Sequence, residues 1–468
     1  MIFNSLSFIL FFLITFIIYY IVSKKYRYIV LLIASYVFYA FAGFKYIFLL
    51  LFITLLSYLF GFLINKINDK KKKKILLFIF VIINIICLIY FKYLGFFVNV
   101  FNKMFFSSFS IEKIVVPLGI SFFVLQAMTY PIDVYRGSVF VEKNFLRFAL
   151  FVSFFPQILS GPIEKSKIML PQFRKEHNFN YKNIFYGFII MLYGYFQKIV
   201  VADLLACGVN NVFDNLKDYS GIPLIIAVFL YSFQIYFDFC SYSNIARGCA
   251  KVFGFDLTNN FNNPYFADSI KNFWGRWHIS LSSWFKEYLY FPLGGNRKGS
   301  LRTYFNIIVV FLISGLWHGA NYTYIIWGLL HGLYQVIERV INKRSRYKII
   351  NVIVTYLLVV FAWIFFRANT ISDVGYILIN IFKVNFVDLK SQLLSIGFDI
   401  YDLKLLFVSI IFIFIVDLIK EKKNILNVVY NSPSFFKVAV VLVLAFWIII
   451  FGHYGPGFDN SQFIYLGY

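Results

Sequence analysis

The sequence is poor in charged residues and in histidine. Only 14% of its 468 residues are Asp, Glu, Lys or Arg, and it has 5 histidines. Soluble globular domains carry about 25% charged residues, so this deficit excludes an ordinary soluble domain. Hydrophobic residues instead make up 61% of the chain, and its mean hydropathy is +0.76. We therefore predict an integral membrane protein that is surrounded by the lipid bilayer.

The sequence also lacks the period-two alternation that transmembrane β-strands show, for example in the apolar run 75–90. Its apolar runs are long instead, and we find roughly 11 to 13 near the ~20 residues that a spanning helix needs. The 4 cysteines form no Cys-x-x-Cys pair, so neither a disulfide framework nor a zinc site is indicated. We predict an all-α polytopic membrane protein with additional re-entrant or interfacial helices and no bound metal.

Acidic residues are scarce, with 21 Asp and Glu against 44 Lys and Arg, which gives a net charge of +23. A nucleic-acid partner is not expected, because the basic residues form short clusters between apolar runs, including 24–27, 70–74 and 343–348. That pattern is typical of cytoplasmic loops. Two apolar runs, 28–43 and 46–66, return the chain to the same side, so we expect the amino terminus to lie outside. We expect the first apolar run to be a retained span, since its charges follow it.

No Pro/Gly/Ser-rich linker divides the chain, so we expect one membrane domain over 1–468. From 117 to 367, polar and ionisable residues appear within apolar surroundings. Such groups cost about 2.5–3.5 kcal/mol each at the bilayer centre and tend to mark functional pathways. We therefore place the catalytic core at about 110–370, and we interpret the flanking spans as framework.

Residues 271–297 contain three tryptophans, Trp274, Trp277 and Trp284, at helical spacing, with Arg276 on the opposite face. The spacing predicts one amphipathic helix over about 273–290, interfacial or re-entrant rather than spanning. A basic pair follows at 297–298, so we expect His278 to lie toward the cytoplasmic leaflet.

Residues 314–332 repeat the pattern Gly-x-x-His-Gly, around His318 and again around His331. Glycines four residues apart allow helix backbones to approach closely, so we interpret them as packing positions. We leave His331 with a structural, hydrogen-bonding role. His318 precedes a turn that ends at Asn321, where irregular backbone at membrane depth would have to face protein or a cavity. On the residues alone, catalysis and structural hydrogen bonding stay open for His318.

Five segments carry a resemblance to a known family, with the patterns WHISLSSWF and WHG as its most specific parts. The segments 117–137, 154–163, 234–255, 260–297 and 314–332 resemble the membrane-bound O-acyltransferase superfamily, in its branch of alginate- and peptidoglycan-acetylating membrane proteins. The resemblance implies that His318 is the catalytic histidine and His278 the second family histidine. We also assign Trp277, Trp317, Asn321, Asp238 and Arg276 to the substrate channel. One departure is Asn244, where the family pattern has Asp.

The resemblance further implies a function. We expect an acetyltransferase that takes acetyl groups from cytoplasmic acetyl-CoA, a donor substrate rather than a bound cofactor, and moves them across the cell membrane. The acceptor would be an extracytoplasmic cell-wall or secreted polysaccharide, reached through a secreted or membrane-anchored acetyltransferase partner. The alternatives are D-alanyl transfer to teichoic acid, a lipid or sterol acyltransferase, and a non-enzymatic polysaccharide-precursor transporter. We see no inverted repeat of the kind that many transporters show.

Overall fold

A computed structural model describes residues 1–110, 114–341, 345–455 and 464. Regular structure in these residues is helical throughout, and no strand occurs among them, which confirms the all-α prediction. Residues 343–344 of the last basic cluster lie outside the described residues. The contacts group into two compact units, Met1–Phe188 with Ala246–Thr258, and Ile189–Ile245 with Asn259–Tyr468.

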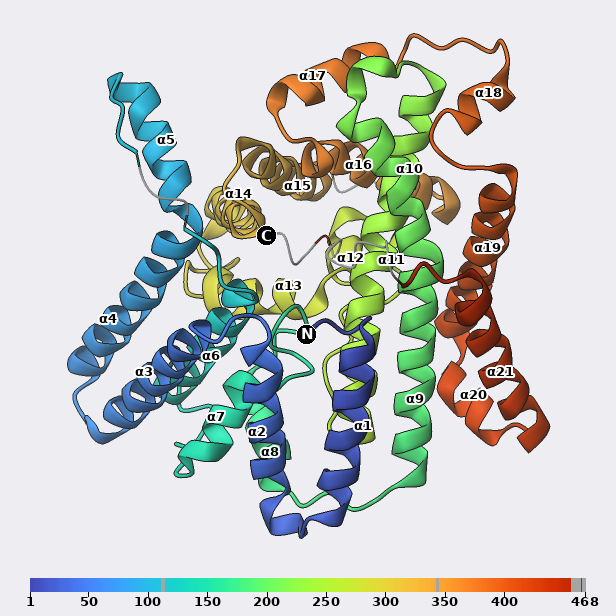
Figure 1. The fold of residues 1–468 in the computed structure, drawn as a ribbon. Coiled ribbons are helices and arrows are strands. Elements are labelled where there is room, and N and C mark those ends of the chain that lie inside the picture. Colours follow the sequence, from blue (N-terminus) through green and yellow to red (C-terminus); the bar gives the residue numbers. More distant parts are fainter. Residues whose placement is uncertain (111–113, 342–344, 456–463, 465–468) are drawn as a thin grey trace. The chain divides into compact units, whose positions relative to one another are not determined.

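The first unit contains eight α-helices and parts of two more (Figure 1). Its helices are α1 (Leu6–Ile21), α2 (Arg27–Ala40), α3 (Tyr46–Lys66), α4 (Lys70–Leu88), α5 (Leu94–Phe105), α6 (Ile120–Tyr135), α7 (Phe145–Ser153), α8 (Ser166–Arg174), the start of α9 (Tyr181–Tyr195) and the end of α11 (Ile222–Val252). Helix α6 is buried over almost its whole length and packs against α3 and α4. A short 3₁₀ turn joins α1 to α2, and a π-helical stretch joins α4 to α5.

The second unit holds the rest of α9, most of α11 and the remaining helices. These remaining helices are α10 (Asp203–Asp214), α12 (Ile270–Trp274), α13 (Ile279–Phe285), α14 (Gly299–His318), α15 (Tyr322–Ile341), α16 (Lys348–Arg367), α17 (Ile371–Asn380), α18 (Leu389–Leu394), α19 (Ile400–Lys422), α20 (Ile425–Asn431) and α21 (Ser434–Phe451). π-Helical stretches follow α9, at Phe196–Ala202, and α13, at Lys286–Tyr290.

Among the residues that the structure describes, seven helices are long and apolar enough to cross a membrane by length and composition. They are Tyr46–Lys66, Lys70–Phe105, Tyr181–Asp214, Ile222–Val252, Gly299–His318, Lys348–Arg367 and Ser434–Phe451. This number is lower than the roughly 11 to 13 apolar runs that the sequence contains. Apolar runs do not reveal where a helix stops, and several of them fold into shorter helices such as α1, with 16 residues, and α7, with nine.

The predicted hairpin of 28–43 and 46–66 is present as α2 and α3. Its turn includes Gly43, whose φ of 137° is disfavoured for residues with a side chain. On α3, Phe48, Phe52 and Leu59 are exposed, as expected for a helix that faces lipid rather than water. The lysine run does not form a loop: α4 begins at Lys70, and the Asp69 carboxylate accepts hydrogen bonds from its first turn.

Helices α14 and α15 form a closely packed hairpin, drawn in yellow in Figure 1. A Cβ on Gly315 would lie 2.2 Å from the Tyr324 carbonyl oxygen, and one on Gly328 would lie 2.3 Å from that of Phe311. Both distances are far below van der Waals contact, so only glycine fits at either position. The prediction that these glycines are packing positions is confirmed.

The single amphipathic helix predicted over 273–290 is wrong. Helix α12 ends at Trp274, the chain turns through Gly275–His278, and α13 begins at Ile279 before a π-helical stretch. The physical reason is that His278 adopts a left-handed conformation, with φ 42° and ψ 52°, which a continuous right-handed helix cannot contain.

Candidate active site

His278 occupies the break between α12 and α13 as the N-cap residue of α13. Its side chain is fully buried, and its ring meets that of Phe239 edge-on at a centroid distance of 4.6 Å. Left-handed backbone is uncommon for residues other than Gly, Asn and Asp, and costs roughly 1–3 kcal/mol. Burial lowers the pKa of His278 to about 3, so the ring is neutral near pH 7. The site therefore holds a neutral imidazole on a residue whose backbone is strained.

Asn260 supplies the cap that His278 does not make. The His278 side chain makes no capping hydrogen bond at the start of α13. The Ile279 N–H instead donates to the main-chain oxygen of Asn260 at 3.0 Å, and the Ser280 N–H donates to its side-chain Oδ1 at 3.1 Å. These bonds satisfy the first two donors of α13 from outside the helix.

His318 ends α14 and is 2% exposed. Three rings meet its imidazole near-perpendicularly: Trp317 at 4.9 Å, Trp327 at 5.0 Å and Phe366 at 5.3 Å between centroids. The Trp317 ring is also 6.1 Å from that of His278. Trp317 thus contacts both histidines that the family resemblance selects. The helix ends at His318 as predicted, and Gly319 is extended.

His331, in the second copy of the motif, has a different environment. It is fully buried, and its Nδ1 accepts a hydrogen bond from the Trp274 indole N–H at 3.3 Å. The rings of Trp274 and Trp327 lie 5.1 Å and 5.0 Å from its own. This arrangement fits the structural role predicted from the sequence.

Trp277, which we assign to the channel from the sequence, belongs to the same aromatic cluster as His318. Its ring lies 5.0 Å from Trp363, which is 5.8 Å from Trp327, and Trp327 contacts His318. Trp277, Trp327 and Trp363 are at most 1% exposed. Buried aromatic rings around His318 keep water from the site.

Asp238 and Asn321 are both bound to other residues of the protein. Lys198 Nζ lies 2.6 Å from Asp238 Oδ1 and 2.7 Å from Asp203 Oδ1, and all three side chains are buried. Asn321 accepts from the Thr323 N–H at 3.3 Å, as a cap of α15, and donates to the Asn369 carbonyl at 2.8 Å. These contacts give both residues a structural role in addition to the predicted role in the channel.

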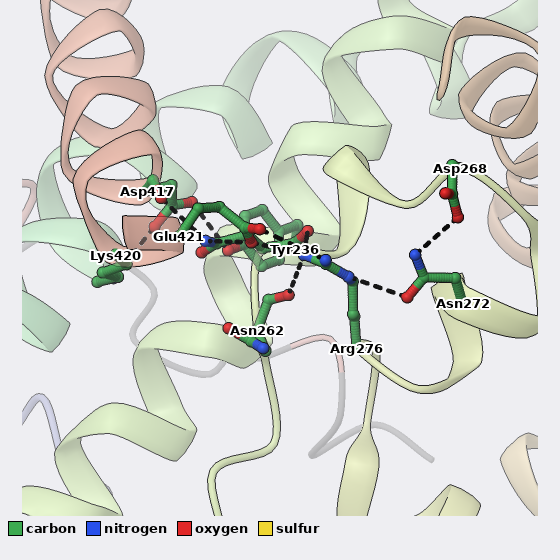
Figure 2. Close-up of polar contacts among 9 residues, drawn as sticks. Tyr236, Asn262, Asp268, Asn272, Arg276, Asp417, Lys420 and Glu421 are labelled. Carbon is green, nitrogen blue, oxygen red and sulfur yellow. Dashed lines mark hydrogen bonds and ion pairs between the residues drawn. The ribbon is translucent and has the colours of Figure 1, made fainter. Parts of the chain in front are cut away.

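Arg276 is engaged by α19 (Figure 2). Its Nη1 lies 2.6 Å from Glu421 Oε1, and it donates to the carbonyl oxygens of Asn262 and Asn263 at 3.3 and 3.4 Å. The Asn263 amide also donates to Glu421 Oε1 at 3.0 Å. The geometry favours a role for Arg276 in fastening the 260–278 segment to α19.

Sequence reasoning missed three features of the site. A lysine inside the apolar stretch 181–214 is a signal that could have identified Lys198. The rings of Trp363 and Phe366 come from α16, about 45 residues beyond His318, and no local pattern connects them. Nothing in the Asn-rich run 259–263 indicates that Asn260 caps a helix 19 residues later.

Comparisons with known proteins show which family the chain is similar to. The profile of a family described as MBOAT, membrane-bound O-acyltransferase family, matches residues 74–377. The chain is 39% identical to a peptidoglycan O-acetyltransferase of Helicobacter pylori, over 77% of this chain and 74% of that protein. It is 37% identical to a "probable alginate O-acetylase" of Pseudomonas aeruginosa, over 80% and 73%. A teichoic acid D-alanyltransferase of Bacillus subtilis is 26% identical, over 54% and 69%.

Proposed function

This chain belongs to the membrane-bound O-acyltransferase family and is a multi-pass membrane O-acyltransferase, and from that premise we propose that it transfers acetyl groups from acetyl-CoA. The donor would bind on the cytoplasmic side of the cell membrane, and the acetyl group would reach a hydroxyl group of an extracytoplasmic polysaccharide. The whole chain would act as one domain, with its catalytic core at about 110–370.

The observation that carries the proposal is the contact of two buried histidines, His278 and His318, with the same ring of Trp317. Acyl transfer from a thioester needs a base beside the acceptor hydroxyl, and a neutral imidazole is suited to that role near pH 7. An aromatic surrounding also limits hydrolysis of the thioester by water.

We assign the base to His318. Its imidazole takes the proton of the acceptor hydroxyl as that oxygen attacks the thioester carbonyl carbon. The C–O bond forms, the C–S bond breaks, and the imidazolium returns the proton to the departing CoA thiolate, so the enzyme ends unchanged. His278, with a lowered pKa and a rigid backbone, holds the donor at the cytoplasmic end of the channel.

The names of the relatives suggest the acceptor. One relative is named for peptidoglycan and another for alginate, and both are polysaccharides that lie outside the cytoplasm. We therefore propose a polysaccharide acceptor for this chain, reached through a secreted or membrane-anchored acetyltransferase partner.

D-Alanyl transfer is the second candidate, because a teichoic acid D-alanyltransferase also matches the chain. Acetyl transfer is favoured because the two relatives named for O-acetylation match at 39% and 37% identity over about three quarters or more of this chain, against 26% over 54%. A non-enzymatic transporter is disfavoured by the family match itself.

Inside-out membrane vesicles from the producing cell test the donor directly, since their cytoplasmic face is accessible. Radiolabelled acetyl-CoA is expected to leave alkali-labile acetate in polymer or partner protein when the chain is present, and not when its gene is deleted. Labelling by activated D-alanine in the presence of its carrier protein, without labelling by acetyl-CoA, would overturn the proposal in favour of D-alanyl transfer.

A further inference from the structure

The side chain of Asn260 has one atom that the fold does not use. Asn260 is fully buried. Its Oδ1 accepts from the Ser280 N–H, and because that group can only donate, the orientation of the amide is fixed. The other end of the amide, Nδ2, has no hydrogen-bond partner among the residues that the structure describes. Buried amide donors are almost always paired, so an exception beside a candidate active site needs an explanation.

The location of this donor is set by the same bonds that hold His278. The main-chain oxygen and Oδ1 of Asn260 bind the N–H groups of Ile279 and Ser280, the two residues that follow His278. Phe261, next in the chain, packs against Phe239 at 5.1 Å, and Phe239 contacts His278. The Asn260 amide is therefore held beside the break that contains His278, against the first turn of α13.

The loop that carries Asn260 is also held at its other end. The Asn262 N–H donates to the Arg276 carbonyl at 2.9 Å, and Arg276 is paired with Glu421 of α19. Asn263 donates to the main-chain oxygen of Asp417 and to Glu421. A donor on so constrained a loop needs little reorganisation when a ligand arrives, which is the property that makes hydrogen-bond donors effective at a developing negative charge.

We propose that Asn260 Nδ2 donates a hydrogen bond to the carbonyl oxygen of the acyl donor. This inference rests on the proposed function. As the acceptor oxygen attacks the thioester carbon, the C=O electron pair moves onto that oxygen, and Nδ2 stabilises the resulting oxyanion. The pair returns as the C–S bond breaks, and the amide keeps both of its protons throughout. Asn260 is then a catalytic residue, in addition to positioning His278.

The test variant is Asn260→Asp, which keeps an oxygen to accept from Ser280 but replaces the donor with a second acceptor. Loss of one oxyanion donor typically lowers kcat about 10²–10³-fold. We expect a loss of at least about 10²-fold in acetyl transfer by full-length protein in inside-out vesicles, with a KM for acetyl-CoA within about threefold of wild type. Asn380→Asp, at a buried asparagine on α17, controls for a new carboxylate and should remain active.

The pH dependence separates a donor from a cap. A protonated carboxyl group has an O–H that can donate, so the activity of Asn260→Asp relative to wild type should rise as the pH falls. A residue that only caps α13 predicts a flat or falling ratio, because an ionised carboxylate accepts from Ser280 at least as well. A flat or falling ratio overturns the proposal.

Asn260→Ala gives a second variant without a charge, and it retains the main-chain bond to Ile279. Per folded protein it should also lose at least about 10²-fold. Activity within about threefold of wild type in either variant would overturn the donor role. The proposed function fails separately, if wild-type vesicles transfer no acetate from acetyl-CoA in the same assay.

Discussion

The indole N–H of Trp274 donates to Nδ1 of His331 at 3.3 Å in a buried setting. Since Nδ1 accepts, the neutral imidazole carries its proton on Nε2. This bond fastens α12 to α15, immediately before the break that contains His278. The two copies of the Gly-x-x-His-Gly pattern therefore differ in role. His331 joins two helices, whereas His318 lies among aromatic rings.

Replacing His331 should therefore cost stability more than chemistry. His331→Phe leaves the Trp274 N–H buried without an acceptor, which costs about 1–3 kcal/mol. We expect a lower unfolding temperature, measured by tryptophan fluorescence in detergent, with folded protein that still transfers acetate. A double-mutant cycle with Trp274→Phe compares the losses of unfolding free energy. The losses of the two single variants should sum to more than the loss of the double variant. Strict additivity would contradict the bond.

Two Gly→Ala substitutions, one inside the α14–α15 hairpin and one on α17, should have opposite effects on stability. At Gly328, a Cβ would lie 2.3 Å from the Phe311 carbonyl oxygen, so Gly328→Ala should destabilise the protein by about 1–3 kcal/mol through overpacking. At Gly375, inside α17, a Cβ would meet nothing within 4 Å, and Gly375→Ala should stabilise by about 0.5–1 kcal/mol. Unfolding curves of the two variants test the packing, and a tolerated Gly328→Ala would refute it.

Those glycines show what sequence can predict in this protein. Small residues four apart, an apolar run of helical length and a following turn are local signals. They predicted close helix packing at the glycines and a turn after His318, where α14 ends. The classification as an all-α membrane protein rests on composition in the same way. The interruption between the apolar runs 28–43 and 46–66 is a further local signal, and the structure has a turn there that includes Gly43.

The break at His278 could not be predicted, because its cause is not local. Tryptophans at helical spacing fit a continuous helix and two short helices equally well. What decides between them is Asn260, which binds the first N–H groups of α13 from 19 residues away. The ion pair of Arg276 with Glu421 is not predictable from the sequence for the same reason, because Glu421 lies 145 residues along the chain.

The lowered pKa of His278 predicts a pH-dependent stability. A histidine in the unfolded chain binds a proton near pH 6.5, whereas the buried His278 does so only near pH 3. Its contribution is therefore fully present above about pH 6.5 and is lost as the pH falls toward 3. Asparagine tolerates the left-handed backbone, so His278→Asn is the test variant. Its unfolding temperature should fall less between pH 7.5 and pH 5 than that of wild type. Parallel pH profiles would rule out the buried neutral imidazole.

The topology remains a prediction from charge. The test uses a background without the 4 native cysteines. Phe44→Cys places a single thiol just before α3, and Lys71→Cys places one in the first turn of α4. A membrane-impermeant maleimide should label Phe44→Cys in intact cells and Lys71→Cys only after permeabilisation, because the basic clusters stay in the cytoplasm. The reverse labelling pattern would invert the map.

The central claim is that His318 is the general base, and His318→Gln tests it most directly. Glutamine keeps a hydrogen-bonding side chain in the aromatic surroundings but cannot take a proton. General-base assistance contributes about 10²–10⁴-fold, so acetyl transfer from acetyl-CoA should fall at least about 10²-fold, with an unfolding temperature near that of wild type. His331→Gln serves as the matched control and should lose less. Folded His318→Gln protein that transfers acetate within about threefold of wild type would contradict the account.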